Sequence, residues 1–352
     1  MIAIVLFSHA MNAFDGWETE APDGFWGILA LIIRVGTPTF FVIFGVAIEL
    51  VHVQRWQAGG GKQVRRALTK RAAQCYLAFA LVAVAAVIGG ELPIAELVPG
   101  LLLLREVPNG TVLSFYAFAC LACLVLVPLR LKIGAVGVLI VCIAWWPIEA
   151  MIDATVDSSG SYFLPRVLGI GEGAGPSMFH GLALVAGGMV IGQVVRAMLN
   201  SRLSIRQLAP AAAVVGVAVV GAAIVLVQFG LAETVRRWLD ISEFRQTNHW
   251  AYFVLGFVAA VLVLAITYLV VERFGITRNR PPGPFGSSSL LAFGGGNVAL
   301  NLIIGLGFVA PNAPIALAVS CAFVGAVWVT VKVGRIVKAR RRERQLVGSQ
   351  TV

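Results

Sequence analysis

The side chain with the clearest chemical potential in this sequence is a histidine near its start. His9 lies within the apolar run MIAIVLFSHAMNAF. An imidazole exchanges a proton near neutral pH, so it can act as a general base or as a nucleophile. Asn12 follows three residues later and would share its helix face, where its amide could fix the tautomer. An ionisable group in an apolar segment needs a partner or a function. The residues alone slightly favour a structural histidine whose hydrogen bond is satisfied, and the sequence leaves both interpretations open.

A second candidate is Arg34, in the apolar segment IIRVGTPTFFVIFGVAIEL. Pro38 follows closely, and proline removes a backbone hydrogen bond, so the segment is predicted to kink within the membrane. Backbone groups freed by a kink are commonly satisfied beside a cavity. Arg34 therefore either pairs with an acid on a neighbouring helix or lines such a cavity.

Basic residues also gather in RWQAGGGKQVRRALTKRAAQCY. They occupy neighbouring helical positions, so their charges can converge on one anion. Arginine's planar fork is well suited to phosphate, whereas anchoring against anionic lipid needs only charge near the surface. The residues concerned are Arg65, Arg66, Lys70 and Arg71.

Two further patterns have simpler explanations. The run FGGGN, around Gly294–Gly296, predicts close helix packing, with an unwound segment as the alternative. Cys120 and Cys123 form a C-x-x-C pair, but no further ligands lie nearby, so we expect buried thiols and no metal site.

The composition determines which elements position these groups. Of 352 residues, 59% are hydrophobic and 12% are charged, which is typical of polytopic membrane proteins. Long apolar stretches without alternation predict an all-α integral membrane bundle rather than a barrel. We expect about ten transmembrane helices, at 1–14, 26–53, 72–90, 111–129, 133–151, 178–195, 208–229, 249–271, 288–310 and 314–332.

The net charge of +10 is distributed unevenly along the chain. Alternate loops and the tail from Lys332 hold 21 of the 27 lysines and arginines. By the positive-inside rule both termini are predicted to be cytoplasmic. This distribution indicates membrane orientation rather than nucleic-acid binding. We expect a multi-pass protein of the cell (inner or plasma) membrane, with a single domain over residues 1–335 and a basic cytoplasmic tail over 336–352.

Four segments, taken in order, resemble the membrane acyltransferase-3 superfamily. They are AIVLFSHAMNAF, TPTFFVIFGVAIEL, RRALTKRAAQCYLAF and VLSFYAFACLACLVLVPL, within about the first 130 residues. The resemblance extends more loosely to glucan succinyltransferases and heparan-type glucosaminide acetyltransferases. Phe44 stands where that family often has serine, and the family's arginine ten residues before the histidine would fall before Met1. A first span of only about 21 Å also predicts an earlier start.

The resemblance implies transfer of an acetyl or other short acyl group from cytoplasmic acyl-coenzyme A, most simply acetyl-coenzyme A, to a carbohydrate or lipid acceptor. His9 would be the general base or the acyl relay, and Asn12 and Arg34 would stabilise the oxyanion. The basic residues of the loop would bind the donor's phosphates: Arg65, Arg66, Lys70 and Arg71.

Two rival functions are compatible with the same pattern. One is a transporter or flippase for a small anionic or glycolipid substrate, which predicts an internal repeat between the two halves. The other is a partner protein without its own activity, in which His9 and the loop arginines would be dispensable. The sequence leaves the acceptor, the acyl chain and any homo-oligomer undetermined.

Overall fold

The structure, a computed structural model, describes residues 2–14, 24–156, 158, 160–171, 175–200, 204–274 and 288–349. The structure is 83% helical, and the described residues contain no strand, which confirms the all-α prediction. The elements are α1 (Ile2–Ala13), α2 (Gly24–Arg34), α3 (Gly36–Ala47), η1 (Ile48–Val53), α4 (Gln54–Gln57), α5 (Gly61–Ile88), η2 (Ile94–Glu96), α6 (Leu97–Leu101), α7 (Thr111–Ile143), α8 (Trp145–Asp153), η3 (Leu164–Leu168), α9 (Met178–Leu199), α10 (Ile205–Phe229), α11 (Leu231–Leu239), η4 (Ile241–Arg245), α12 (Trp250–Arg273), α14 (Ser289–Ile304) and α15 (Ala313–Ser349).

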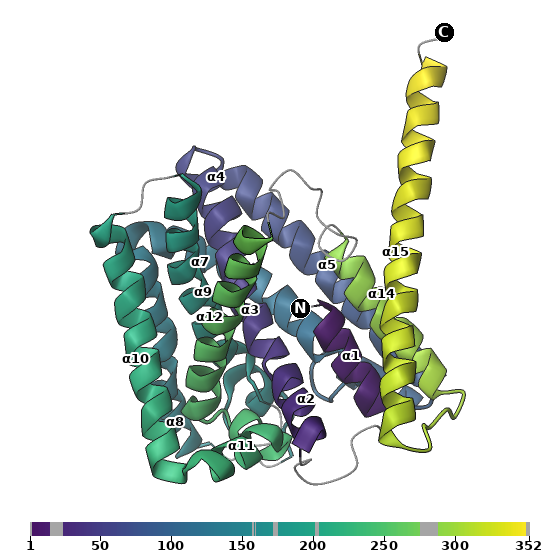
Figure 1. Ribbon diagram of the computed structural model, residues 1–352, viewed down its shortest axis with the longest axis horizontal. Coiled ribbons are helices and arrows are strands. Elements are labelled where there is room, and N and C mark those ends of the chain that lie inside the picture. Colours follow the sequence, from purple (N-terminus) through teal and green to yellow (C-terminus); the bar gives the residue numbers. More distant parts are fainter. Residues whose placement is uncertain are drawn as a thin grey trace.

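The helices form one bundle with two distinct ends (Figure 1). We call them the α4 end, at the top of Figure 1, and the α11 end, at the bottom. Seven helical segments of the described chain are long and apolar enough to cross a membrane, as expected of a multi-pass protein in contact with lipid. The apolar helices α1 and α14 are shorter.

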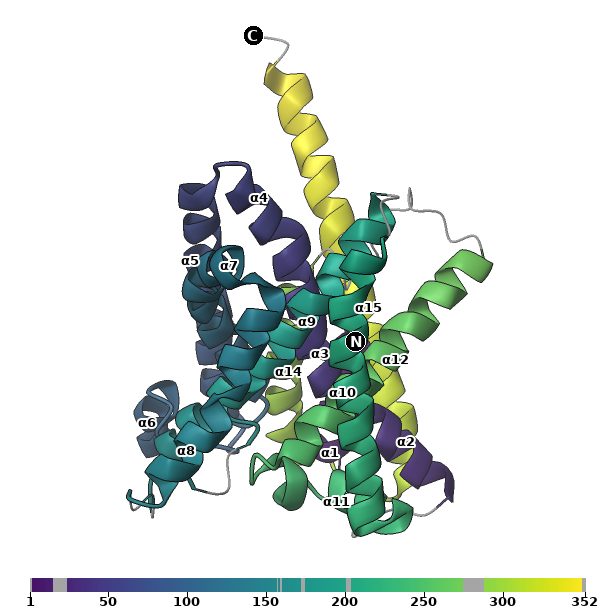
Figure 2. The same ribbon diagram turned by 90° about the vertical axis from the view of Figure 1, so that its left-hand side faces the viewer.

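One of the seven segments, Thr111–Asp153, accounts for two of the predicted spans. It breaks at Gly134, whose φ of 80° and ψ of 168° are accessible to glycine. Arg130 bonds to Glu49 near the α4 end, whereas Trp145 bonds to the Leu168 carbonyl near the α11 end. The chain therefore reverses direction close to Gly134, and α8 lies at the α11 end (Figure 2). The total of ten spans and the cytoplasmic termini remain predictions.

The interruption predicted near Pro38 occurs slightly earlier. α2 ends at Arg34 and α3 begins at Gly36, so the break falls at Val35, three residues before the proline. Proline crowds the turn that precedes it, which explains this offset. The break leaves Arg34 at the C-terminus of α2, close to the α11 end.

A close helix crossing joins α3 to α9. A Cβ at Gly45 would overlap the Val185 carbonyl, and one at Gly188 would overlap the Val42 carbonyl. Small residues of this kind let two backbones approach in the membrane, where packing replaces the hydrophobic effect as the main source of association. The two helices thus form a tightly packed centre around which the others are arranged.

A buried ion cluster joins three elements near the α4 end. Arg130 of α7 donates two hydrogen bonds to the fully buried Glu49 of η1, at 2.9 and 2.8 Å. Arg196 of α9 lies 3.4 Å from the same carboxylate. Two guanidinium groups therefore compensate a carboxylate that would otherwise be costly to bury.

The helix α15 packs against α1 and extends well beyond the bundle at the α4 end (Figure 1). The predicted basic tail, residues 336–352, begins inside this helix. Residues 350–352 lie outside the described part of the chain.

Candidate functional site

A polar cavity of about 260 Å³ lies at the α11 end, among α1, α2, α11 and α12. His9 and Asn12 reach it from α1, and Arg34 reaches it from the end of α2. Trp238 and Arg245 line it from α11 and η4. The structure therefore brings the three predicted catalytic residues into one cavity.

His9 is held by a residue that the sequence did not single out. Its Nδ1 lies 2.8 Å from Oδ1 of Asn297, a fully buried residue of α14. An amide oxygen accepts a hydrogen bond, so in this orientation of the Asn297 amide Nδ1 carries the proton and Nε2 keeps the free lone pair. Asn12 lines the same cavity. The tautomer-fixing role predicted for Asn12 thus belongs to Asn297.

The glycine run before Asn297 explains how it reaches His9. A Cβ at Gly296 would lie 2.7 Å from Cδ2 of Leu6, so α1 and α14 approach closely there. This confirms the packing interpretation of the run, and α14 is continuous rather than unwound. A polar amide directly after a glycine run in an apolar helix was the available signal for Asn297.

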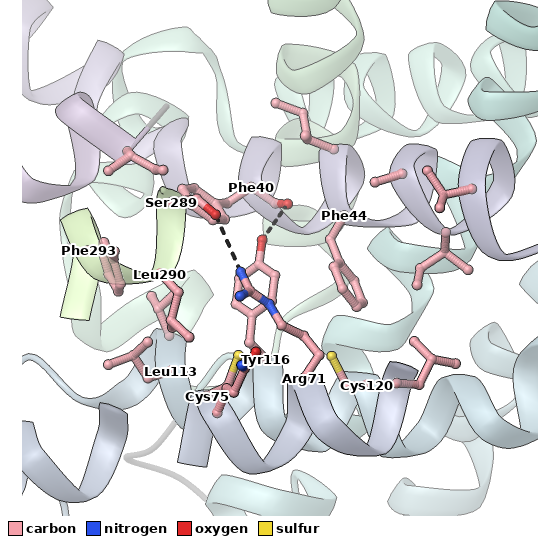
Figure 3. A pocket seen from close by; sticks show the side chains of 18 of the residues that line it. Phe40, Phe44, Arg71, Cys75, Leu113, Tyr116, Cys120, Ser289, Leu290 and Phe293 are labelled. Carbon is pink, nitrogen blue, oxygen red and sulfur yellow. Dashed lines mark hydrogen bonds between the residues drawn. The ribbon is translucent and has the colours of Figure 1, made fainter. Parts of the chain in front are cut away.

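A second, larger cavity of about 790 Å³ lies among α1, α3, α5, α7 and α14 (Figure 3). Its wall is largely apolar and includes Phe40, Phe44 and Tyr116. The Tyr116 hydroxyl donates to the Phe40 carbonyl at 3.0 Å. Arg71 also lines the cavity, and its Nη2 donates to Oγ of Ser289 at 3.3 Å. We call the two spaces the polar cavity and the apolar cavity.

The two cavities share a lining residue and are therefore close to each other. Val112 lines both of them. Phe293 lines the apolar cavity, and the centroid of its ring lies 5.7 Å from that of His9. Phe293 therefore contacts both the imidazole and the apolar cavity.

The predicted phosphate-binding residues separate into two groups. Lys70 and Arg71 line the apolar cavity. Arg65 and Arg66 are exposed and line neither cavity, and the Arg65 guanidinium lies 5.2 Å from the ring centroid of Trp56. This cation–π contact occupies Arg65 at the turn between α4 and α5.

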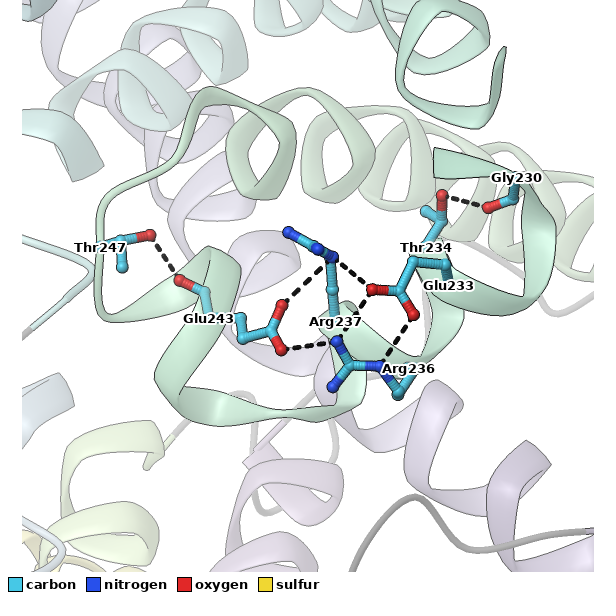
Figure 4. Close-up of polar contacts among 7 residues, drawn as sticks. All are labelled: Gly230, Glu233, Thr234, Arg236, Arg237, Glu243 and Thr247. Atoms are coloured by element: carbon cyan, nitrogen blue, oxygen red, sulfur yellow. Dashed lines mark hydrogen bonds and ion pairs between the residues drawn. The ribbon is translucent and has the colours of Figure 1, made fainter. Parts of the chain in front are cut away.

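An ion-pair network at the α11 end supports one wall of the polar cavity (Figure 4). Arg236 bonds to both Glu233 and Glu243, and Arg237 contacts the same two carboxylates. Hydrogen bonds from Arg236 and Arg237 lower the pKa of Glu233 from 4.5 to about 2. The network ties η4, which ends at Arg245, to α11.

Comparison with family models, with curated proteins and with solved structures finds no match. The acyltransferase resemblance therefore stays a prediction. Within the described residues, no group of His, Cys, Asp or Glu is arranged to hold a metal ion. Cys120 and Cys123 are buried, as expected of packed thiols.

Proposed function

We propose that this chain is a membrane-embedded acyltransferase that moves an acetyl or other short acyl group from acyl-coenzyme A to a hydroxyl or amine of a carbohydrate or lipid. The observation that carries the proposal is the His9–Asn297 hydrogen bond of 2.8 Å in a polar cavity. It leaves Nε2 as the basic atom of a buried imidazole. The apolar cavity behind Phe293 supplies a separate space for the donor.

The transfer begins with the acceptor in the polar cavity. His9 Nε2 takes the proton of the attacking hydroxyl or amine as its oxygen or nitrogen bonds to the thioester carbon. The carbonyl oxygen becomes negative, and the Asn12 amide and the Arg34 guanidinium stabilise it. The C–S bond then breaks, and the leaving thiolate takes the proton from the imidazolium. Base and leaving-group acid are thus the same residue.

Two basic side chains of the apolar cavity match the negative charge of the donor. Lys70 and Arg71 line this cavity, and they can hold the phosphates of coenzyme A at the membrane surface. The predicted topology places these residues on the cytoplasmic side, where acyl-coenzyme A is found. The thioester reaches His9 when the Phe293 ring moves aside.

The test uses purified protein with acetyl-coenzyme A and a panel of glycan and lipid acceptors, with release of free coenzyme A as the signal. His9→Gln keeps a hydrogen-bonding side chain but cannot accept the proton. We expect the rate to fall about 10²–10⁴-fold at unchanged thermal stability.

The matched control is His249→Asn. His249 caps α12 through its Nδ1, which accepts from the Ala251 N–H, and asparagine is a comparable N-cap. This variant should keep full activity. Near-normal turnover by His9→Gln would reject the role of His9. Absence of turnover from the unmodified protein, together with proton-coupled uptake in vesicles, would establish a transporter instead.

A further inference from the structure

We propose that the acceptor carries a carboxylate or phosphate on a sugar-sized unit, and that Arg245 binds this anionic group. The inference rests on the proposed function for its acceptor, but the anion site can be measured without any turnover. It concerns a residue that the acyl-transfer step does not use.

Arg245 has an incomplete set of partners in a cavity built around it. It lines the polar cavity, and its Nε is buried without a hydrogen-bond partner. Within the described part of the chain, its guanidinium makes no hydrogen bond or ion pair. Arg245 is half-buried, and leaving its buried Nε without a partner has a cost that an anion in the cavity would offset.

The charges around Arg245 favour an anion. Arg34 lines the same cavity and interacts favourably with Asp240. Arg245 repels Arg34 and the protonated form of His9. Among the lining residues, the only carboxylate is Glu106, whose side chain is exposed. The lining of the polar cavity therefore has an excess of positive charge. A carboxylate or phosphate would neutralise this charge and could accept two parallel hydrogen bonds from a guanidinium.

The backbone of Arg245 is held by contacts on both sides of η4. Glu243, two residues earlier in η4, is held by Arg236 and Arg237 of α11 (Figure 4). On the other side, a Cβ at Gly175 would overlap the Arg245 carbonyl, so the two backbones pack directly. Arg245 is thus pre-organised, which lowers the entropic cost of binding.

The size and lining of the cavity indicate a sugar-sized unit. About 260 Å³ lies near the lower limit for small-molecule sites, which leaves room for one ring rather than an oligosaccharide. Trp238 lines it and stacks on Tyr252, with ring centroids 5.2 Å apart and an interplanar angle of 24°. The buried Nε1 of Trp238 has no partner in the described chain. Aromatic surface with a few directed donors is typical of a ligand site.

The experiment compares three soluble sugars by calorimetry on the full chain in detergent. Glucuronate and glucose 6-phosphate each carry one anionic group, whereas glucose carries none. We expect both anionic sugars to bind at least about tenfold more tightly than glucose, since hydrogen bonds to charged groups are among the stronger ones. Arg245→Gln should abolish that difference. Arg245→Lys should keep part of it, because lysine retains the charge without the planar fork.

The control is Arg105→Gln, an exposed arginine whose nearest carboxylate, Glu96, lies 3.9 Å away and which lines neither cavity. It should bind all three sugars as the unmodified protein does. Equal affinity for glucose and the anionic sugars, or undiminished anion binding by Arg245→Gln, would overturn the proposal. If Arg245→Gln fails to fold, Arg245→Lys decides, and unchanged discrimination in that variant counts against the bidentate site.

Two further outcomes separate the hypotheses. Selective anion binding without release of coenzyme A supports the anion site and rejects the acyltransferase. Turnover with neutral acceptors alone supports the acyltransferase and rejects the anion site. Phosphatidylglycerol nanodiscs are compared with phosphatidylcholine nanodiscs in parallel. If Arg245→Gln alters only the preference for phosphatidylglycerol, the occupant is a lipid headgroup and the sugar assignment is wrong.

Discussion

Replacement of Asn297 by alanine removes the partner of His9 without touching the imidazole itself. The variant loses the 2.8 Å contact between Nδ1 and Oδ1, and no other described side chain bonds to that ring nitrogen. Loss of one buried hydrogen-bond partner costs about 1–3 kcal/mol. If the loss acts on the orientation of the base, kcat falls about 5- to 150-fold, at one factor of ten per 1.36 kcal/mol.

The matched control lies one turn further along α14. Asn301 is also fully buried, and its amide bonds to the Val82 carbonyl at 3.1 Å and to Asn109 at 2.7 Å. Asn301→Ala therefore loses more hydrogen bonds than Asn297→Ala but leaves His9 untouched. We expect it to lower the melting temperature more and kcat less.

The assay is steady-state release of coenzyme A, with thermal unfolding measured on the same preparations. A positioning role predicts a lower kcat for Asn297→Ala at an unchanged KM for the donor. The reasoning is refuted if Asn297→Ala turns over normally. It is also refuted if both variants lose activity in proportion to their loss of stability, because a general packing defect would do the same.

The other predictions concern the donor site, the buried ion cluster, the ion-pair network and the topology. Arg71→Ala should weaken binding of acetyl-coenzyme A about tenfold in calorimetry, whereas Arg65→Ala should not change it, because only Arg71 lines the apolar cavity. Arg130→Met leaves the buried carboxylate of Glu49 undercompensated and should lower the free energy of unfolding in denaturant by about 3 kcal/mol. The folded pKa of Glu233, about 2, lies below its ordinary 4.5, so its ion pairs stabilise the fold above pH 4.5, and this contribution is lost as the pH falls towards 2. The difference in melting temperature between the unmodified protein and Glu233→Gln should therefore stay constant above pH 5 and shrink below 4.5. A C-terminal reporter that is active only outside the cytoplasm should remain silent.

Local patterns in the sequence were sufficient to predict that this is a helical membrane protein and to nominate His9, Asn12 and Arg34. The composition and the length of the apolar stretches determine the fold class. An ionisable residue within an apolar stretch can be recognised from the sequence alone, whatever it packs against in the structure. The three residues come from two successive helices, so their meeting in one cavity needs only a short connection.

Residues contributed by distant segments were not predictable in the same way. Asn297 meets His9 across 288 residues of sequence, and helical periodicity describes only the faces of a single helix. Arg245 lies in a short π-helical segment between two helices, where no apolar repeat predicts which way its side chain faces. Charge clustering also could not separate Arg65, which packs on Trp56, from Arg71, which lines a cavity.

The buried ion cluster has a consequence for biosynthesis. Glu49 is translated well before Arg130, and Arg130 before Arg196, because the chain grows from its N-terminus. When the segment that carries Glu49 first meets the membrane, neither arginine that later compensates the carboxylate exists. We therefore expect η1, which carries Glu49, to stay near the aqueous boundary until α7 and then α9 are inserted. A ribosome stalled between α7 and α9 would hold a nascent chain in which Glu49 has one of its two arginine contacts. Cross-linking of a cysteine introduced beside Glu49 to the insertion machinery should persist until α9 emerges.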